Sequence, residues 1–226
     1  MKKTALILAA LIAGSSVRAQ DATSSYSLTL DFPYVSEYVF RGISYADDAV
    51  QPSIEFATGD FYAGIWTSLP VTNGFTNEYD FYAGYGIAVS ETWALDLGAT
   101  YYYYPQTDSG DEQFEPFVGI SGDIGGGFTS SLYVYYETEF KVFTYQGSLG
   151  YSIPLSDTMS LDLSGTLGYV DPDAGESYAY WGLGSVLTYK LNQSASAYVG
   201  LNYANNDLDW AEGDFLFVNT GVTIGF

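Results

Sequence analysis

The sequence predicts an all-β protein, specifically a transmembrane antiparallel up-and-down β-barrel of about twelve strands. Apolar and polar residues alternate in segments of about ten residues, which is the pattern of a strand with two different faces. Charged residues make up 15% of the 226 residues, against about 25% in ordinary soluble domains. The chain is also rich in aromatic residues, with 23 Tyr and 14 Phe. Low charge, many aromatic rings and a two-residue period together favour a barrel in a membrane.

The first element is a segment that directs export. Lys2 and Lys3 precede an apolar run over residues 4–14, and Ala19 is a small residue at a suitable cleavage position. This run is too short for a membrane helix, which needs roughly 20 apolar residues. We therefore expect residues 1–19 to be a signal peptide and residues 20–226 to form a single outer-membrane β-barrel domain. The chain has no Cys, which excludes a lipid-modified cysteine and a disulfide framework.

The alternating segments predict the strands and their connections in order. We expect strands near residues 26–40, 50–58, 61–69, 78–89, 92–104, 113–122, 127–137, 141–153, 158–170, 176–189, 194–204 and 214–226. Tight connections alternate with longer ones along the chain, except for a short link near Glu139. This alternation is typical of barrels with short periplasmic turns and long outer loops, and an even strand number places both termini in the periplasm.

The last segment shows the two faces most clearly. One face carries Leu216, Val218 and Val222, whereas the other carries Asn219 and Thr223. The first set suits lipid and the second suits a lumen. The strand ends at the terminal Phe226, through which we expect the barrel assembly machinery to bind the chain. A soluble sandwich or lectin has similar strands, but the terminal Phe and the aromatic content favour the membrane barrel.

Aromatic residues gather near the expected strand ends, and two interpretations are open. Tyr101 to Tyr104 and Tyr133 to Tyr136 suit the aromatic girdles of a barrel, where rings lie at the level of the lipid headgroups. Some rings instead fall on the face that we expect to line the lumen, where they could stack on sugars or fill a narrow pore. The candidates are Tyr62, Trp66, Tyr82 and Phe117.

Several consecutive motifs in the first half of the chain resemble the TorF-type family of candidate porins. They are Tyr38-Val39-Phe40-Arg41-Gly42-Ile43-Ser44, Phe61-Tyr62-Ala63-Gly64-Ile65-Trp66-Thr67-Ser68, Glu78-Tyr79-Asp80-Phe81-Tyr82-Ala83-Gly84-Tyr85 and Tyr102-Tyr103-Tyr104-Pro105. The second half matches only as generic barrel strands. The resemblance implies a bacterial outer-membrane channel and leaves its solute open.

Composition excludes several classes of function. Loss of Lys2, Lys3 and Arg18 with the signal peptide removes three cations and lowers the formal net charge from −21 to −24. Such a chain is a poor ligand for nucleic acid. The sequence has no His, the base on which the usual outer-membrane hydrolases and transferases depend, so we predict no enzymatic activity. No motif indicates a cofactor, and the acidic loops lack the twelve-position spacing of a calcium loop.

Acidic residues point to an electrostatic function. Acids in the expected outer loops would form a negative mouth that attracts cations; they are Asp47, Asp48, Asp108, Asp111, Glu112, Asp171, Asp173, Glu176, Asp207, Asp209, Glu212 and Asp214. Acids at inward positions or near the mouth would line the pore and favour cation passage. These pore-lining or constriction candidates are Glu55, Glu78, Asp80, Asp96, Glu115 and Asp162, together with Arg41.

Arg41 is the only arginine that remains after signal cleavage. We expect it at the outer end of the first strand, where it either leans into the lumen against Glu55, Glu78 or Asp80 or forms an ion pair that fixes one loop.

The sequence thus predicts an outer-membrane porin of a Gram-negative cell, a passive and cation-preferring diffusion channel for small solutes. It would be surrounded by outer-membrane lipid and lipopolysaccharide. Two alternatives remain: a channel selective for sugars or nucleosides, and a structural or adhesive barrel with a blocked lumen.

Overall fold

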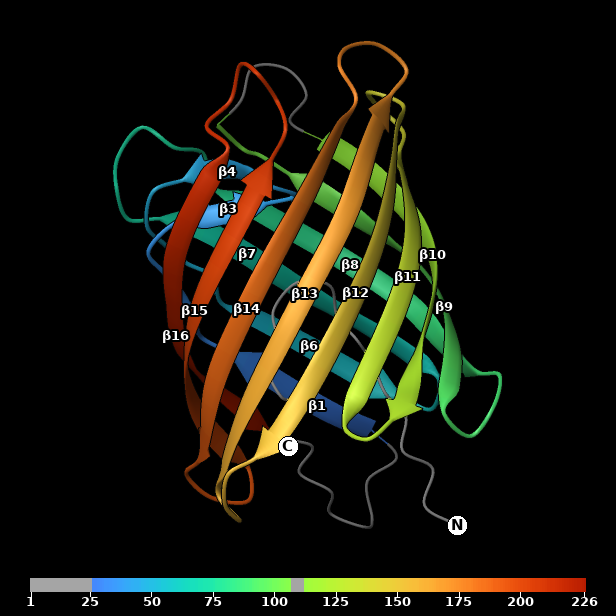
Figure 1. Cartoon of the computed structure of the whole chain (residues 1–226), viewed down its shortest axis with the longest axis vertical. Coiled ribbons are helices and arrows are strands. Elements are labelled where there is room, and N and C mark those ends of the chain that lie inside the picture. Colours follow the sequence, from blue (N-terminus) through green and yellow to red (C-terminus); the bar gives the residue numbers. More distant parts are fainter. Residues whose placement is uncertain (1–25, 107–111) are drawn as a thin grey trace.

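A computed structural model of the chain describes residues 26–106 and 112–226 and contains a closed antiparallel barrel of twelve strands. This part of the chain contains sixteen β-segments, because two wall strands are interrupted and one hairpin lies apart from the wall. β1 and β2 together form the first wall strand, and β5 and β6 form the second. Each later segment from β7 to β16 is one wall strand, and the wall is drawn in Figure 1. The predicted fold class is therefore confirmed.

The strand bounds agree with the expected segments to within a few residues. The strands are β1 (Tyr26–Asp31), β2 (Tyr34–Val35), β3 (Tyr38–Phe40), β4 (Ile43–Ala46), β5 (Ala49–Val50), β6 (Ser53–Thr58), β7 (Phe61–Pro70), β8 (Glu78–Ala88), β9 (Trp93–Tyr103), β10 (Glu112–Gly125), β11 (Phe128–Glu137), β12 (Val142–Pro154), β13 (Met159–Pro172), β14 (Tyr178–Lys190), β15 (Ala195–Asn206) and β16 (Asp214–Gly225).

The barrel closes where the last strand meets the first. Thr29 pairs with Gly225 and Asp31 with Thr223 in an antiparallel register. Beyond these pairs, Leu28 and Phe226 exchange two backbone hydrogen bonds, of 2.9 and 3.1 Å. Closure matters because an open strand edge in hydrocarbon would leave backbone groups without partners, at a cost of several kcal/mol each.

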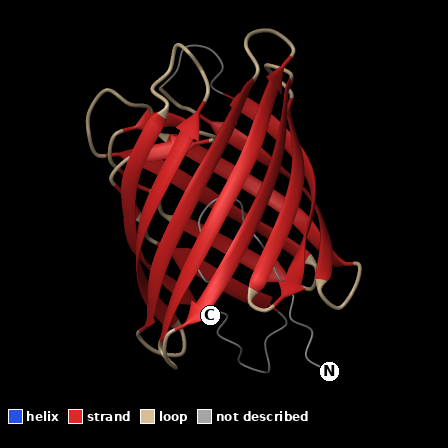
Figure 2. Cartoon of the chain, in the orientation of Figure 1, coloured by secondary structure: helices blue, strands red, loops and turns tan. Residues whose placement is uncertain are grey.

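The two ends of the barrel differ. Short turns follow β6, β8, β10, β12 and β14 at the end where β1 begins and β16 finishes, which we call the terminal end. Mostly longer connections follow β2, β7, β9, β11, β13 and β15 at the opposite end, which we call the loop end. The short link after β11, over residues 138–141, is the expected exception. Figure 2 shows that strands and loops make up the described residues.

The wall has an apolar outside and a polar or aromatic inside. Leu132, Leu167, Leu183 and Leu216 point outward and are 56–70% exposed, which is unusual for leucine outside a membrane. Their sequence neighbours point inward and are less exposed, as for Tyr133 at 8% exposure. No helix in the described residues is long and apolar enough to cross a membrane. The apolar outer belt fits a bilayer crossed by strands.

The prediction for the first strand is wrong at its end. We expected residues 26–40 to form one wall strand, but the wall strand finishes at Val35 and β3 belongs to a separate two-stranded sheet with β4. Residues 41–46, which we expected in an outer loop, form the turn and second strand of this hairpin. The expected division into a signal peptide of residues 1–19 and a domain of residues 20–226 stays a prediction, since residues 1–25 lie outside the described part of the chain.

Candidate functional site: an inward hairpin and an acidic pore wall

The connection between the first two wall strands folds into the barrel lumen as a β-hairpin. We call this hairpin, Tyr38–Phe40 with Ile43–Ala46 and its turn, the inner hairpin. The ring of Tyr38 lies 5.5 Å from Trp66 of β7, and that of Phe40 lies 6.5 Å from Tyr102 of β9. Its turn reaches β10, β14 and β15, on other sides of the wall. A segment that contacts strands so far apart must lie inside the barrel near the loop end (Figure 1).

A tight turn places Arg41 at the tip of the inner hairpin. Arg41 and Gly42 both have a positive φ, of 49° and 77°, which is the geometry of a type I′ turn. Glycine is required at the second position, because a Cβ there would lie 2.8 Å from the Cβ of Tyr180 and 3.0 Å from the carbonyl oxygen of Asn205. The amide of Asn206 donates a hydrogen bond to the Gly42 carbonyl, which fixes the tip against β15.

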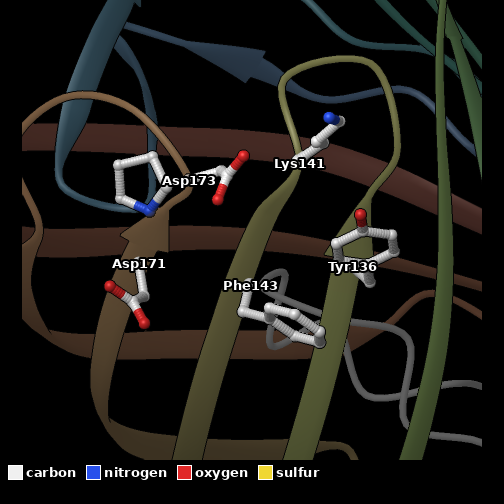
Figure 3. Close-up of a pocket in the computed structure, with 6 residues that line it drawn as sticks. Tyr136, Lys141, Phe143, Asp171 and Asp173 are labelled. Atoms are coloured by element: carbon white, nitrogen blue, oxygen red, sulfur yellow. The ribbon is translucent and has the colours of Figure 1, made fainter.

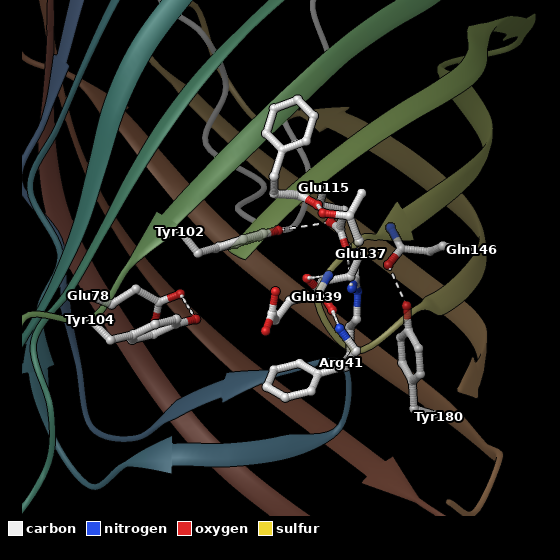
Figure 4. Close-up of polar contacts among 12 residues, drawn as sticks. Arg41, Glu78, Tyr102, Tyr104, Glu115, Glu137, Glu139, Gln146 and Tyr180 are labelled. Atoms are coloured by element: carbon white, nitrogen blue, oxygen red, sulfur yellow. Dashed lines mark hydrogen bonds and ion pairs between the residues drawn. The ribbon is translucent and has the colours of Figure 1, made fainter. Parts of the chain in front are cut away.

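Arg41 forms a bidentate ion pair with Glu115 of β10, shown in Figure 4. Nη1 donates to Oε2 at 2.7 Å and Nη2 donates to Oε1 at 2.8 Å. The guanidinium carbon also lies 4.7 Å from the ring centre of Phe40 and 4.8 Å from that of Tyr135, so both rings contribute cation–π contacts. Tyr102 donates a further hydrogen bond to Glu115, of 2.9 Å. The pair is buried, with side-chain exposures of 11% and 2%.

The expected partners of Arg41 were wrong. We expected Arg41 either to lean against Glu55, Glu78 or Asp80 or to form an ion pair that fixes one loop. It forms an ion pair that holds the inner hairpin, but its partner is Glu115, which lies 74 residues away and was a separate pore-lining candidate. The reason is topological, because the inner hairpin carries Arg41 away from its own end of the first strand and across the lumen. Glu78 instead accepts a hydrogen bond of 2.9 Å from Tyr104, which is also visible in Figure 4.

The remaining acidic candidates lie on inward-facing positions of the wall. Glu55 accepts a hydrogen bond of 3.2 Å from Tyr82, and Asp162 accepts one of 3.1 Å from Ser160. Asp96 accepts two, each of 2.9 Å, from Tyr62 and Tyr133. Oδ1 of Asp80 is buried and has no hydrogen-bond partner within the described residues. The structure brings Arg41 and Glu115 together and spreads the other candidates over β6, β8, β9 and β13.

Inward tyrosines take part in a repeated arrangement across three adjacent strands, which is set by strand register. In three rows a tyrosine lies flat over a glycine of the next strand, and its hydroxyl reaches an oxygen acceptor on the strand after that. The rows are Tyr82, Gly64 and Glu55; Tyr133, Gly119 and Asp96; and Tyr180, Gly168 and Gln146. A side chain at any of these glycines would overlap the tyrosine ring. Because hydroxyl donors are uncharged, the first two rows orient wall carboxylates without adding positive charge, whereas the third ends on the amide of Gln146.

The interpretation of the aromatic clusters as girdles is wrong for about half of their residues. Tyr102, Tyr133, Tyr135 and Tyr180 point inward and are buried, because consecutive residues of a strand face opposite sides. The residues that alternate with them, Tyr101, Tyr103 and Tyr136, face the outside and are half-buried. The rings of Tyr62, Tyr82 and Phe117 pack over wall glycines on the inner face, as proposed for lumen-lining candidates.

Acidic residues also surround the loop end. Asp47, Asp171, Asp173, Glu176, Asp207, Asp209, Glu212 and Asp214 are half-buried or exposed there, whereas Asp108 and Asp111 lie outside the described residues. Asp48 accepts a hydrogen bond of 2.7 Å from Thr72, and this bond lowers the pKa of the Asp48 carboxyl. Lys141, Phe143 and Asp173 line a shallow pocket of about 300 Å³ on this rim (Figure 3). In the described residues, no group of three or more acidic side chains is placed to hold a metal ion.

Comparison with known proteins supports the fold and a family. A family model described as "Bacterial protein of unknown function (Gcw_chp)" matches residues 19–223. Comparison with curated protein sequences gives no match.

Two solved porins share the barrel. The NanC porin is 13% identical, with a TM-score of 0.60, and the similarity covers 87% of this chain and 98% of that one. The KdgM porin is 13% identical, with a TM-score of 0.62, over 88% and 99% of the two chains. A second structure, of the KdgM porin with disordered oligogalacturonate, has 11% identity and a TM-score of 0.60, over 88% and 99%. At this level of identity the similarity concerns the fold.

Proposed function

The chain belongs to the Gcw_chp family, and we propose that it is an outer-membrane porin, a passive and cation-preferring diffusion channel for small solutes. The observation that carries the proposal is the two-sided wall. Its outside is an apolar belt, and its inside carries Asp31, Glu55, Asp96, Glu115 and Asp162. Carboxylates on a pore wall attract cations and repel anions.

The charge of the lumen argues against acidic solutes. One structure of the KdgM porin, which has the same fold, was obtained with oligogalacturonate, a polymer of acidic sugars. A pore for such a polyanion needs positive groups along its wall. Among the described residues of this chain, the cationic side chains are Arg41, Lys141 and Lys190; Arg41 is bound to Glu115, and the lysines lie at the two rims of the barrel. Small cations and uncharged solutes therefore suit this lumen better.

Two alternatives have specific observations in their favour. Inward rings such as Tyr62 and Tyr82 favour a channel for sugars or nucleosides, because aromatic faces stack on such solutes. The inner hairpin favours a structural barrel with a blocked lumen. Current that saturates with solute concentration would identify the first, and absence of current would identify the second.

The location and partners follow from the same proposal. We expect signal cleavage near Gln20, insertion among outer-membrane lipid and lipopolysaccharide, and delivery by the barrel assembly machinery through the strand that ends at Phe226. The resemblance to TorF-type candidate porins in the motifs around Arg41, Trp66 and Tyr82 supports the same class. The similarity to porin folds gives no support to an enzymatic function.

The test is single-channel recording of the refolded mature protein in a planar bilayer, with a salt gradient across the membrane. A steady current whose reversal potential indicates cation preference would support the proposal. An anion-selective current would overturn the acidic-wall mechanism, and silence would favour the structural barrel.

A further inference from the structure

The inner wall of the barrel has two unlike halves. The half formed by β6 to β11 carries large inward side chains, among them Tyr62, Tyr82, Tyr133 and Tyr135. The half formed by β12 to β15 carries small ones over most of its length. We call this second set the polar strip; it consists of Ser148, Gly150, Ser152, Asp162, Ser164, Thr166, Gly184 and Asn202.

Strand register makes the polar strip continuous. Ser148 pairs with Thr166, and their hydroxyl oxygens are 3.0 Å apart. One row further, Gly150, Ser164, Gly184 and Asn202 lie opposite one another on four adjacent strands. Small side chains leave room beside a wall, whereas rings fill it. The polar strip is therefore the part of the inner wall whose side chains leave the most room for a solute.

We infer that solutes pass along the polar strip and that Asp162 is the acidic residue that sets the preference for cations there. This inference rests on the proposed channel function and deepens it. Asp162 lies between Ser152 of β12 and Val186 of β14, and Ser160 of its own strand donates a hydrogen bond to it. Asp96 and Glu115 lie instead on the other half of the wall, where tyrosine hydroxyls donate hydrogen bonds to them. A passing ion thus meets the carboxylate of Asp162 more directly than theirs.

The strip also indicates the chemistry of the solute. Its hydroxyl and amide groups can exchange hydrogen bonds with a hydrated cation or with a small hydroxyl-rich uncharged molecule. It offers no cation to an anionic solute in the described residues, because Arg41 is held by Glu115. Asp162 is thus the specificity-determining residue of the path.

The absence of cysteine from the chain allows a direct test of the path. We would prepare Ser164→Cys on the polar strip and Ser131→Cys as a matched control. Ser131 also points inward, but it lies on β11 in the half with large rings and is only 3% exposed, although it pairs with Ser148 at the edge of the polar strip. During single-channel recording, a small cationic methanethiosulfonate reagent should cause a stepwise loss of current with Ser164→Cys and no change with Ser131→Cys. Loss of current with Ser131→Cys alone would overturn the inference.

The role of Asp162 has its own measurement. Asp162→Asn should move the reversal potential in a salt gradient strongly toward the value for no preference, and Asp96→Asn should move it little. The opposite order would show that the ions pass along the half formed by β6 to β11 and would overturn the inference. Both experiments start from a wild-type channel that conducts. A silent wild type would count against the proposed function, whereas a cation-selective wild type with the opposite mutant order would count against the polar strip alone.

Discussion

At the scale of single residues, the ion pair between Arg41 and Glu115 fixes the inner hairpin. Removal of two charges from water is costly, and only good geometry with additional hydrogen bonds offsets that cost. Here the two bonds of 2.7 and 2.8 Å, the Tyr102 hydroxyl and the two flanking rings supply this geometry. Loss of one partner of a buried pair costs about 3–5 kcal/mol, because it leaves the other charge unpaired.

We expect Arg41→Ala to increase the cation preference of the channel. The change removes the positive charge from the constriction and leaves Glu115 without its ionic partner. The reversal potential in a salt gradient should therefore move further toward the potassium equilibrium value. Lys141→Ala is the matched control, since it removes a cation from the rim outside the lumen. Unaltered selectivity in Arg41→Ala would contradict a charged constriction.

The tyrosine rows lead to a prediction about stability. Gly119→Ala would place a methyl group in the ring of Tyr133 and displace its hydroxyl from Asp96. Overpacking of this kind costs about 1–3 kcal/mol. Gly86→Ala is the control, because it lies in β8 with no heavy atom within 4 Å of the new Cβ. Denaturant titration of the refolded barrels should show a lower midpoint for Gly119→Ala only. Equal midpoints would mean that the rows do not stabilise the wall.

At the scale of elements, the wall strands could be predicted from alternation and the inner hairpin could not. A two-residue period is a local property, so it identifies strands such as β13 and β16 from sequence alone. Tyr38-Val39-Phe40 alternates just as a wall strand does, and only Arg41-Gly42 indicates a turn. Whether the strand continues along the wall or turns inward depends on contacts with β10, β14 and β15, which lie far away in the sequence.

Removal of the inner hairpin should widen the pore without destroying the barrel. Replacement of residues 38–46 by two glycines would keep the pairs of Tyr34 with Val50 and Val35 with Ala49, so the first two wall strands would remain joined. Single-channel conductance should rise several-fold, in proportion to the open cross-section. Deletion of the exposed residues 173–176 from another loop is the control and should leave conductance near the wild-type value. Equal conductance in both deletions would show that the hairpin does not limit the current.

At the scale of the whole molecule, Phe226 contributes to the seam at which the barrel closes. The backbone of Phe226 makes two hydrogen bonds with Leu28, and its ring is 60% exposed. Deletion of Phe226 removes both the bonds and the ring, whereas Phe226→Ala removes only the ring. We expect the deletion to lower the amount of barrel in the outer membrane more than the substitution does, as measured in isolated membranes. Equal losses would assign the effect to the ring, and wild-type amounts of both would exclude a role for this residue in closure or delivery.

The sequence predicts the charge of the lumen but not the partners of the charged residues. The net charge follows from composition, and the inward position of the acids follows from alternation. The partner of each acid does not, because it depends on register across several strands and across the lumen. Asp96 shows this, since its two tyrosine partners lie on β7 and β11, 34 and 37 residues away in opposite directions.

The order in which the chain is synthesised also affects the inner hairpin. Its residues are made early, but the contacts that hold its tip come from much later parts of the chain, 74 residues on at Glu115 and 164 residues on at Asn206. Contacts over such separations form late, because the intervening chain must be ordered first. The tip can therefore reach its final position only after β10 and β15 have been made and have joined the wall. Until then the inner hairpin lacks the contacts that hold its tip across the lumen.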